Sequence, residues 1–146
     1  MTRVTLEIQG GDQLAAALRA YGAAAERHVG DAVNAAGLEL RGEIVKAYQR
    51  GPASGVTYEK SNPNRTHTAS APGEAPATDT GRLASSVNFR REGAMAATVG
   101  SEVVYASMLE FGTARISPRP AWVPATEAMR PKFRQRLETA LARAAR

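Results

Sequence analysis

The stretch DQLAAALRAYGAAAERHVGDAVNAAGLELRGEIVKAY, residues 12–48, decides the fold. Its apolar residues recur at spacings of three and four, which is the period of one face of an α-helix. They are Leu14, Leu18, Tyr21, Ala25, Val29, Val33, Ala36, Leu40, Ile44 and Tyr48. Asp12 stands where a helix N-cap residue is expected. The pattern predicts one long amphipathic helix that organises the rest of the chain.

Four glycines, Gly22, Gly30, Gly37 and Gly42, lie inside this predicted helix. Each costs about 1 kcal/mol relative to alanine. They therefore either bend the helix or allow another backbone to come close. We favour close packing of the helix against a sheet.

Alternation of apolar and polar residues indicates strands on both sides of the helix. The apolar members are Val4, Leu6 and Ile8 in the first strand, Val87 and Phe89 in the second, and Met95, Ala97 and Val99 in the third. A predicted turn at Glu92 and Gly93 joins the last two as an antiparallel hairpin.

Residues 51–80 contain four prolines, three glycines and many Ser and Thr, with Val56 and Tyr58 as the only large apolar residues. Such a composition buries too little apolar surface to order itself. We predict a flexible arm without regular structure that orders on a neighbouring subunit. The arm and its junction supply these candidate contact residues: Tyr58, Pro72, Gly73, Glu74, Asp79, Gly81 and Arg82.

Two further helices are predicted after the arm. Asp79 or Thr80 caps a short helix that points Leu83 inward. Residues 105–111 have helical spacing, and Gly112 stands where helices commonly end with a positive φ.

A proline-rich segment precedes a last helix. Pro118, Pro120 and Pro124 hold Trp122 in an extended segment. The last helix has Pro124 in its first turn and an apolar stripe of Phe133, Leu137 and Leu141, and Pro131 kinks or restarts it.

Together these elements predict one α+β domain over residues 1–146. A small antiparallel sheet of three to four strands packs against the long N-terminal helix and a C-terminal helix, and the arm at 51–80 extends from it. The chain has 29 alanines, so large apolar side chains are few. A buried large side chain contributes about 1.5 to 3 kcal/mol and alanine much less. We therefore expect the protein to gain stability by self-association.

The net charge of +5 is concentrated in the last third of the chain. Arg130, Lys132, Arg134 and Arg136 of the last helix are candidates for contact with DNA or with an acidic partner. A solvated helix face explains the same residues. No motif that reads a DNA groove is present, which disfavours sequence-specific recognition.

Residue types that carry catalysis or bind metals are scarce. The chain has no cysteine, which excludes disulfides, thiolate zinc sites and iron–sulfur clusters. His28 and His67 lack the spacing of metal ligands, so we expect neither a metal nor a cofactor. Glu39 and Glu43 lie four residues apart, but Arg41 and Lys46 interleave with them and favour a solvated helix face over an acid–base pair.

Phosphate-loop, dinucleotide-binding and serine-hydrolase motifs are absent from the sequence. No catalytic residues are expected. The N-terminal residues lack the apolar run of a signal peptide, and no segment approaches the ~20 apolar residues needed to cross a bilayer. We expect a protein without membrane contact.

Two motifs carry a resemblance to a known family. They are SAPGEAPATDTGRLASSV, residues 70–87, and VVYASMLEFGTARISPRPAWVPA, residues 103–125. In order and spacing they resemble the tail-completion and head–tail joining (neck) proteins of long-tailed, lambda-like bacteriophages. Trp122, where phenylalanine is more familiar, and the high alanine content depart from the family pattern.

The resemblance implies a non-enzymatic virion protein at the neck, or top of the tail, made in the host cytoplasm. It implies a ring, by family resemblance a hexamer, that contacts other neck and tail proteins and transiently the packaged DNA. A ring needs two unlike patches on each subunit. The candidate interface residues are Tyr105, Glu110, Phe111, Arg115, Pro118, Arg119 and Trp122. For Phe111 and Trp122 a place in the core is the alternative.

A small basic nucleic-acid-binding protein is the second interpretation of the sequence. Its affinity would fall steeply with salt, because each neutralised phosphate releases counterions. An enzyme of unknown type is a third interpretation. It is disfavoured because no nucleophile, base and orienting group can be assembled from the sequence.

Overall fold

The computed structural model of the protein describes residues 11–146. Its elements are α1 (Gly11–Arg50), β1 (Thr57–Ser61), β2 (Asn64–Thr68), α2 (Arg82–Ser85), β3 (Val87–Gly93), β4 (Ala96–Ser101), α3 (Tyr105–Phe111) and α4 (Trp122–Ala144). The predicted long helix is confirmed as α1, with Asp12 inside its first turn. The strand predicted around Val4, Leu6 and Ile8 lies outside the described residues.

The strands form two separate antiparallel hairpins, β1–β2 and β3–β4. Mixed helix and strand content is therefore confirmed, but the prediction of one sheet with three to four strands is wrong for the described residues. In β3–β4, Phe89 pairs with Val99 as the alternation predicts. The predicted turn at Glu92 and Gly93 is shifted. These residues belong to β3, and the chain reverses at Ala94 and Met95.

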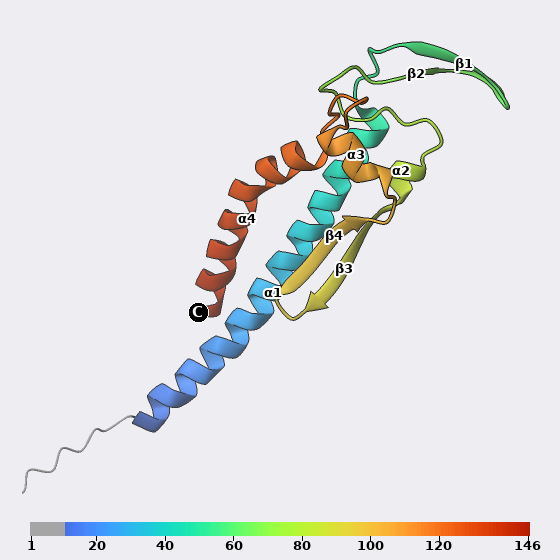
Figure 1. Ribbon diagram of the computed structural model, residues 1–146. Helices are drawn as coiled ribbons and strands as arrows, with labels where there is room; N and C mark the ends of the chain where they lie inside the picture. The colour runs from blue at the N-terminus through green and yellow to red at the C-terminus, as the bar shows by residue number, and fades with distance from the viewer. Residues whose placement is uncertain (1–10) are drawn as a thin grey trace, which may run out of the picture.

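The β3–β4 hairpin lies against α1, and two glycines of α1 allow the close approach (Figure 1). A Cβ atom on Gly37 would lie 2.6 Å from a ring carbon of Phe89, and one on Gly30 would lie 2.3 Å from the carbonyl oxygen of Ala94. Only glycine fits at such distances. Close packing, the favoured interpretation of the glycines, is confirmed at these two positions.

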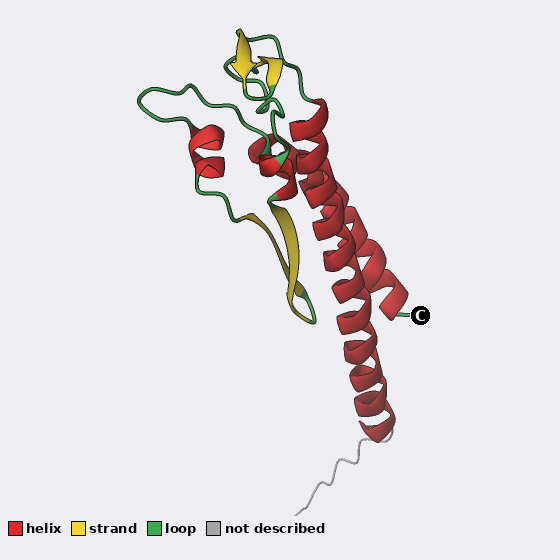
Figure 2. Cartoon of the chain, turned by 90° about the vertical axis from the view of Figure 1, so that its right-hand side faces the viewer, coloured by secondary structure: helices red, strands yellow, loops and turns green. Residues whose placement is uncertain are grey.

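Helix α4 packs along α1 rather than on a sheet (Figures 1 and 2). The core lies where α1 meets α2, the start of β3 and the start of α4. Its buried members are Ile44, Tyr48, Ala84, Val87 and Ala121. The core is small because the members that come from outside α1 are alanine or valine, which bury little area each.

Helix α4 begins at Trp122, so Trp122 is helical and not part of an extended segment as predicted. Pro124 lies in the first turn, as predicted, where its missing N–H is no loss. Pro131 lies inside the helix, which runs on from Trp122 to Ala144. The short helices α2 and α3 are confirmed.

The arm contains regular structure, contrary to the prediction. Strands β1 and β2 pair from Thr57 with Thr68 to Ser61 with Asn64. Most of the hairpin is exposed, because its side chains are largely polar. The strands form although the composition is poor in apolar residues, because they pair with each other along their length and Lys60 and Arg65 form ion pairs with Asp79. The flexibility of the arm stays a prediction.

The N-terminal part of α1 projects beyond the rest of the described chain in both views (Figures 1 and 2). The tip of the β3–β4 hairpin reaches α1 at Gly30, and Arg143 near the end of α4 lines the same cavity as His28. Gly30 is also the first buried residue of α1. Residues 11–27 therefore extend past every element that packs on α1. No helix within residues 11–146 is both long and apolar enough to span a membrane.

Candidate functional site

The carboxylate of Glu110 caps the N-terminus of α4. Its Oε2 accepts hydrogen bonds from the backbone N–H groups of Ala121 at 2.8 Å and Trp122 at 3.0 Å, and its Oε1 accepts one from Val123 at 2.8 Å. Glu110 is only 6 % exposed. A negative charge at this end of a helix interacts favourably with the helix dipole and satisfies N–H groups that lack partners within the helix. One side chain of α3 thus fixes where α4 starts.

The loop between α3 and α4 is folded back by its own backbone. Gly112 ends α3 with a φ of 76°, and a Cβ atom there would lie 2.7 Å from the carbonyl oxygen of Ile116. Thr113 donates its N–H to that oxygen at 2.8 Å, and Arg119 donates its N–H to the carbonyl oxygen of Leu109 at 2.7 Å. The sequence after α3 therefore returns the chain to Glu110, so that α4 starts at its carboxylate.

Trp122 is half-buried against the core and tied to α1. Its indole N–H donates a hydrogen bond to the phenol oxygen of Tyr48. Burial raises the pKa of the Tyr48 hydroxyl, against the opposing effect of the hydrogen bond from Trp122. Of the two alternatives for Trp122, the structure places it at the edge of the core.

Helix α3 turns an apolar face outward. Val104, Met108 and Phe111 follow one another at spacings of four and three, which puts them on one side of the helix. Val104 is 78 % and Phe111 73 % exposed. A groove of about 560 Å³ lies beside them, lined mainly by apolar atoms of the end of β4, α3 and Trp122. Phe111 is thus not a core residue of this chain, and Arg115 and Pro118 are exposed in the loop that follows.

Asp79 fastens the arm hairpin to the start of α2. Its carboxylate pairs with Lys60 of β1, and its Oδ1 lies 2.6 Å from Nη2 of Arg65 of β2 and 3.9 Å from Nδ1 of His67. The hydrogen bond from Lys60 and the charge of Arg65 hold the pKa of Asp79 below its usual value. Asp79 therefore anchors the hairpin. Thr80, the alternative cap, accepts the N–H of Arg82 at 3.4 Å.

Residues 69–79 of the arm are joined to the body of the protein. Glu74 accepts the N–H of Ala71 at 2.8 Å and binds Ser54, and these hydrogen bonds lower the pKa of its carboxyl, with the Ser54 side chain the larger cause. Gly73 donates its N–H to the carbonyl oxygen of Pro118 at 2.9 Å. Thr78 donates its hydroxyl to the carbonyl oxygen of Tyr48 at 2.6 Å.

The two sequence motifs of the resemblance meet at one cavity of about 280 Å³. From the first motif it is lined by Asp79, Gly81 and Arg82, and from the second by Tyr105 and Arg119. Among the described residues, Nε of Arg119 is buried without a hydrogen-bond partner. The structure therefore brings together three of the seven arm candidates and two of the seven interface candidates. Tyr58, Pro72, Gly73 and Glu74 do not line this cavity.

The four basic residues proposed for DNA or an acidic partner do not act as one group. Lys132 and Arg136 turn towards α1 and pair with Glu39, Lys132 at 3.2 Å, whereas Arg130 and Arg134 are exposed. Glu39 thus bridges two helices, and Glu43 pairs with Lys46 at 2.8 Å, so the two glutamates have separate partners.

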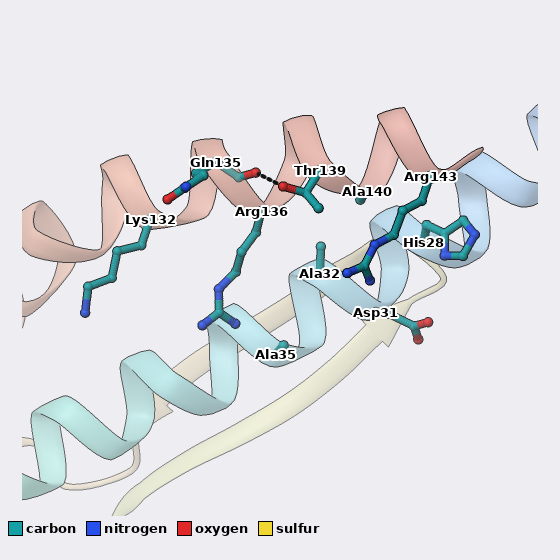
Figure 3. Close-up of a pocket in the computed structure, with 10 residues that line it drawn as sticks. All are labelled: His28, Asp31, Ala32, Ala35, Lys132, Gln135, Arg136, Thr139, Ala140 and Arg143. Atoms are coloured by element: carbon teal, nitrogen blue, oxygen red, sulfur yellow. Dashed lines mark hydrogen bonds between the residues drawn. The ribbon is translucent and has the colours of Figure 1, made fainter. Parts of the chain in front are cut away.

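Figure 3 shows the cavity of about 500 Å³ between α1 and α4, with Lys132 and Arg136 pointing towards α1 and Arg143 beside His28. Asp31 of α1 faces the same cavity. The cavity is open, and polar side chains and alanines both line it. Within residues 11–146 no group of three or more His, Asp or Glu side chains is placed to hold a metal ion.

Sequence reasoning missed two features of these surfaces. The sequence places Glu110 among the candidate interface residues, whereas its carboxylate is turned inward and caps α4. The N–H groups that it binds lie 11 to 13 residues away, beyond any local capping pattern. The second feature is the exposure of Leu14, Leu18 and Tyr21 on the projecting part of α1. Their spacing predicts the helix, but nothing in it indicates that the other elements within residues 11–146 end before reaching them.

These surfaces belong to an α+β domain with two exposed apolar helix faces and no assembled metal cluster among its described residues. A family model described as "Bacteriophage HK97-gp10, putative tail-component" matches residues 12–112, from the start of α1 to the end of α3. The chain belongs to this HK97-gp10-like family of bacteriophage tail components, which confirms the resemblance to phage tail and neck proteins. Neither the curated proteins nor the solved structures gave a match.

Proposed function

We propose that the protein is a non-enzymatic structural subunit of the phage neck, which assembles as a ring at the top of the tail, completes the tail and joins it to the DNA-filled head. The observation that carries the proposal is the family match over residues 12–112. The order of the two motifs at residues 70–87 and 103–125 supports the more specific position at the neck.

The surface of the chain supports assembly. It exposes 10502 Å². A compact monomer of 15.5 kDa exposes roughly 7,200 Å². The excess over the whole chain is about 3,300 Å². Part of the exposed surface is apolar, because Leu14 and Leu18 of α1 and Phe111 of α3 are among the exposed side chains. An assembly that covers these side chains gains the apolar burial that the small core of the single chain lacks.

A ring accounts for two unlike apolar surfaces on one chain. A contact between different patches, repeated around an axis, closes into a ring when the rotation permits. The two surfaces lie far apart on the chain, because α3 lies near the C-terminal end of α1 and the projecting segment is at the other end (Figure 1). A symmetric pair would need only one of them.

The test combines solution assembly with tail binding. Light scattering of the purified protein is expected to give one oligomer larger than a dimer. Negative-stain images are expected to show the protein at one end of tails that were assembled without it, and such tails are expected to join heads only after it is added. A protein that remains monomeric and never binds tails would overturn the proposal.

Salt dependence separates this role from the nucleic-acid-binding alternative. Non-specific DNA binding weakens steeply as salt rises, whereas a ring held by apolar contacts persists. The pairing of Lys132 and Arg136 with Glu39 leaves fewer free cations on α4 than the sequence suggests. We expect an oligomer that survives from 50 to 500 mM salt and DNA retention that is lost in the same range.

A further inference from the structure

We infer that the projecting segment of α1, residues 11–27, docks through Leu14, Leu18 and Tyr21 on the exposed face of α3 of a second copy of the chain. The receiving face consists of Val104, Met108 and Phe111 with the groove beside them. The inference rests on the proposed ring and names the contact that builds it.

The projecting segment of α1 presents a helix face without charge. Leu14 and Leu18 are each 62 % exposed, and Tyr21 lies one turn further along the same stripe. At about 100° per residue, the charged side chains of the segment lie about 110° or more around the helix from the centre of this stripe. They are Asp12, Arg19, Glu26 and Arg27. The segment is therefore amphipathic, although no other element within residues 11–146 packs on it.

Small residues flank the stripe. Ala17, Gly22, Ala24 and Ala25 lie beside the three large side chains and add no bulk. The distance between packed helix axes depends on the side chains at the contact, so such a face permits a short approach. The projecting segment is thus a narrow ridge with three large apolar side chains along about two turns.

The face of α3 has the opposite shape. Phe111 and Val104 border a groove of about 560 Å³ lined mainly by apolar atoms, with Trp122 among its lining residues. Phe111 is the more exposed of the two aromatic side chains there. Aromatic side chains and methionine are enriched at protein interfaces relative to the rest of the surface. A helical ridge fits a groove of this character, as amphipathic helices do in other helix-in-groove contacts.

The area available matches what the contact requires. A stable interface buries about 800 Å² on each partner, and a ring subunit takes part in two interfaces. The required area, about 1,600 Å² for each chain, is smaller than the excess of about 3,300 Å² that the whole chain exposes, and the exposed apolar side chains of α1 and α3 contribute to that surface.

A contact between the projecting segment of α1 and the exposed face of α3 of a second copy covers both surfaces in one kind of interface. A pairing of two α1 segments with each other would bury Leu14, Leu18 and Tyr21 but leave Val104, Met108 and Phe111 open to water. A pairing of two α3 faces would bury the α3 residues but leave the apolar side chains of α1 open to water. The contact of α1 with α3 uses both patches of every subunit in one kind of interface, which can repeat around a ring.

Cysteine cross-linking tests the contact directly, because the chain has no cysteine of its own. The double variant L18C/F111C is treated with a short bismaleimide, both as purified protein and on assembled tails. We expect a ladder of dimers, trimers and higher species on a denaturing gel. The single variants L18C and F111C are expected to give no ladder. In R19C/F111C the cysteine lies on the charged side of α1, and this matched control is expected to cross-link at least tenfold less.

A charge pair provides a second test. Leu18→Lys and Phe111→Glu are each expected to lower the oligomer fraction at least tenfold, with the melting temperature of the single chain unchanged because both side chains are exposed. The combination L18K/F111E is expected to restore part of the oligomer, since the two charges meet only if these surfaces face each other.

The outcomes separate this inference from the proposed function. Protein that is found on tails or in an oligomer, but whose L18C/F111C variant gives no more product than R19C/F111C, overturns the contact and leaves the ring standing. Dimers from L18C alone show instead a pairing of two α1 segments and also overturn it. Protein that is monomeric and absent from tails overturns both.

Discussion

The indole N–H of Trp122 lies 2.7 Å from the phenol oxygen of Tyr48 and donates a hydrogen bond to it. This contact joins the first residue of α4 to the last turn of α1, and the same tyrosine accepts the hydroxyl of Thr78 at its carbonyl oxygen. Tyr48 therefore connects three segments that are distant in sequence: the long helix, the arm and the C-terminal helix.

Trp122→Phe and Tyr48→Phe are each expected to lower the free energy of unfolding by about 0.5 to 1.5 kcal/mol, through loss of this hydrogen bond. Trp122→Phe also removes apolar area and should be the more costly. In a double-mutant cycle, the second substitution should lower the free energy of unfolding by less than it does alone, because the first substitution has already removed the hydrogen bond. Urea denaturation measures all three variants, and strict additivity would contradict the contact.

Glu110→Ala is expected to lower the free energy of unfolding by about 2 to 3 kcal/mol, since three backbone N–H groups at the start of α4 lose a charged acceptor. Glu110→Gln keeps the shape but turns an NH₂ group towards backbone donors, so it should also destabilise. Glu127→Gln, at an exposed position of α4, serves as the matched control and should change stability by less than about 0.5 kcal/mol. Equal effects of E110Q and E127Q would rule out the cap.

Gly37→Ala and Gly42→Ala are expected to have opposite effects, although both lie inside α1. The methyl group added at Gly37 would meet the ring of Phe89, and overpacking of this kind costs about 1 to 3 kcal/mol. At Gly42 no atom lies within 4 Å of the added Cβ, so the higher helix propensity of alanine should stabilise by up to about 1 kcal/mol. Thermal denaturation followed by circular dichroism compares the two, and a stabilising G37A would show that the hairpin does not approach α1 there.

Acid is expected to release the arm hairpin before the helices unfold. Lys60 and Arg65 lower the pKa of Asp79 in the folded protein, and His67 lies beside them. The stabilisation is therefore fully present above the unfolded pKa, about 3.9, and is lost as the pH falls through the lower folded value. Hydrogen exchange of residues 57–68 should rise in that window.

Asp79→Asn should raise the same exchange already at pH 7, because the anchoring charge is absent at every pH. Glu59→Gln, a substitution on the exposed side of β1, should leave it unchanged. If D79N and the unaltered chain exchange alike at pH 7, Asp79 does not hold the hairpin.

The helices and the β3–β4 hairpin could be predicted because their signals are local. The spacing of Leu40, Ile44 and Tyr48 and the alternation of Val87 and Phe89 follow directly from helix and strand periods. The arm hairpin was missed because it depends on contacts between distant residues. Asp79 reaches back to Lys60 and Arg65, and composition alone does not show such pairing.

The candidate surfaces were predictable only in part. Phe111 was expected either in the core or at an interface, and its exposure depends on which side of α3 meets α4. Glu110 illustrates the opposite error, since its carboxylate turns to a backbone segment that is close in space only after Gly112 reverses the chain. Lys132 and Arg136 of α4 pair with Glu39, whereas Arg130 and Arg134 are exposed to solvent. Which basic residues meet Glu39 depends on how α4 packs on α1, and the spacing of residues along one helix does not predict that packing.

The projecting part of α1 also limits how the protein can change length during evolution. Each residue added to or removed from the segment between the stripe and Gly30 rotates Leu14, Leu18 and Tyr21 by about 100° relative to the hairpin and α4. One extra residue would rotate these side chains by about 100° around the helix axis. Seven extra residues would rotate them by nearly two complete turns, so that they point in almost the original direction about 10 Å further along the helix. Insertions of seven or eleven residues should therefore be tolerated better than insertions of other lengths, because they nearly preserve the direction of these side chains.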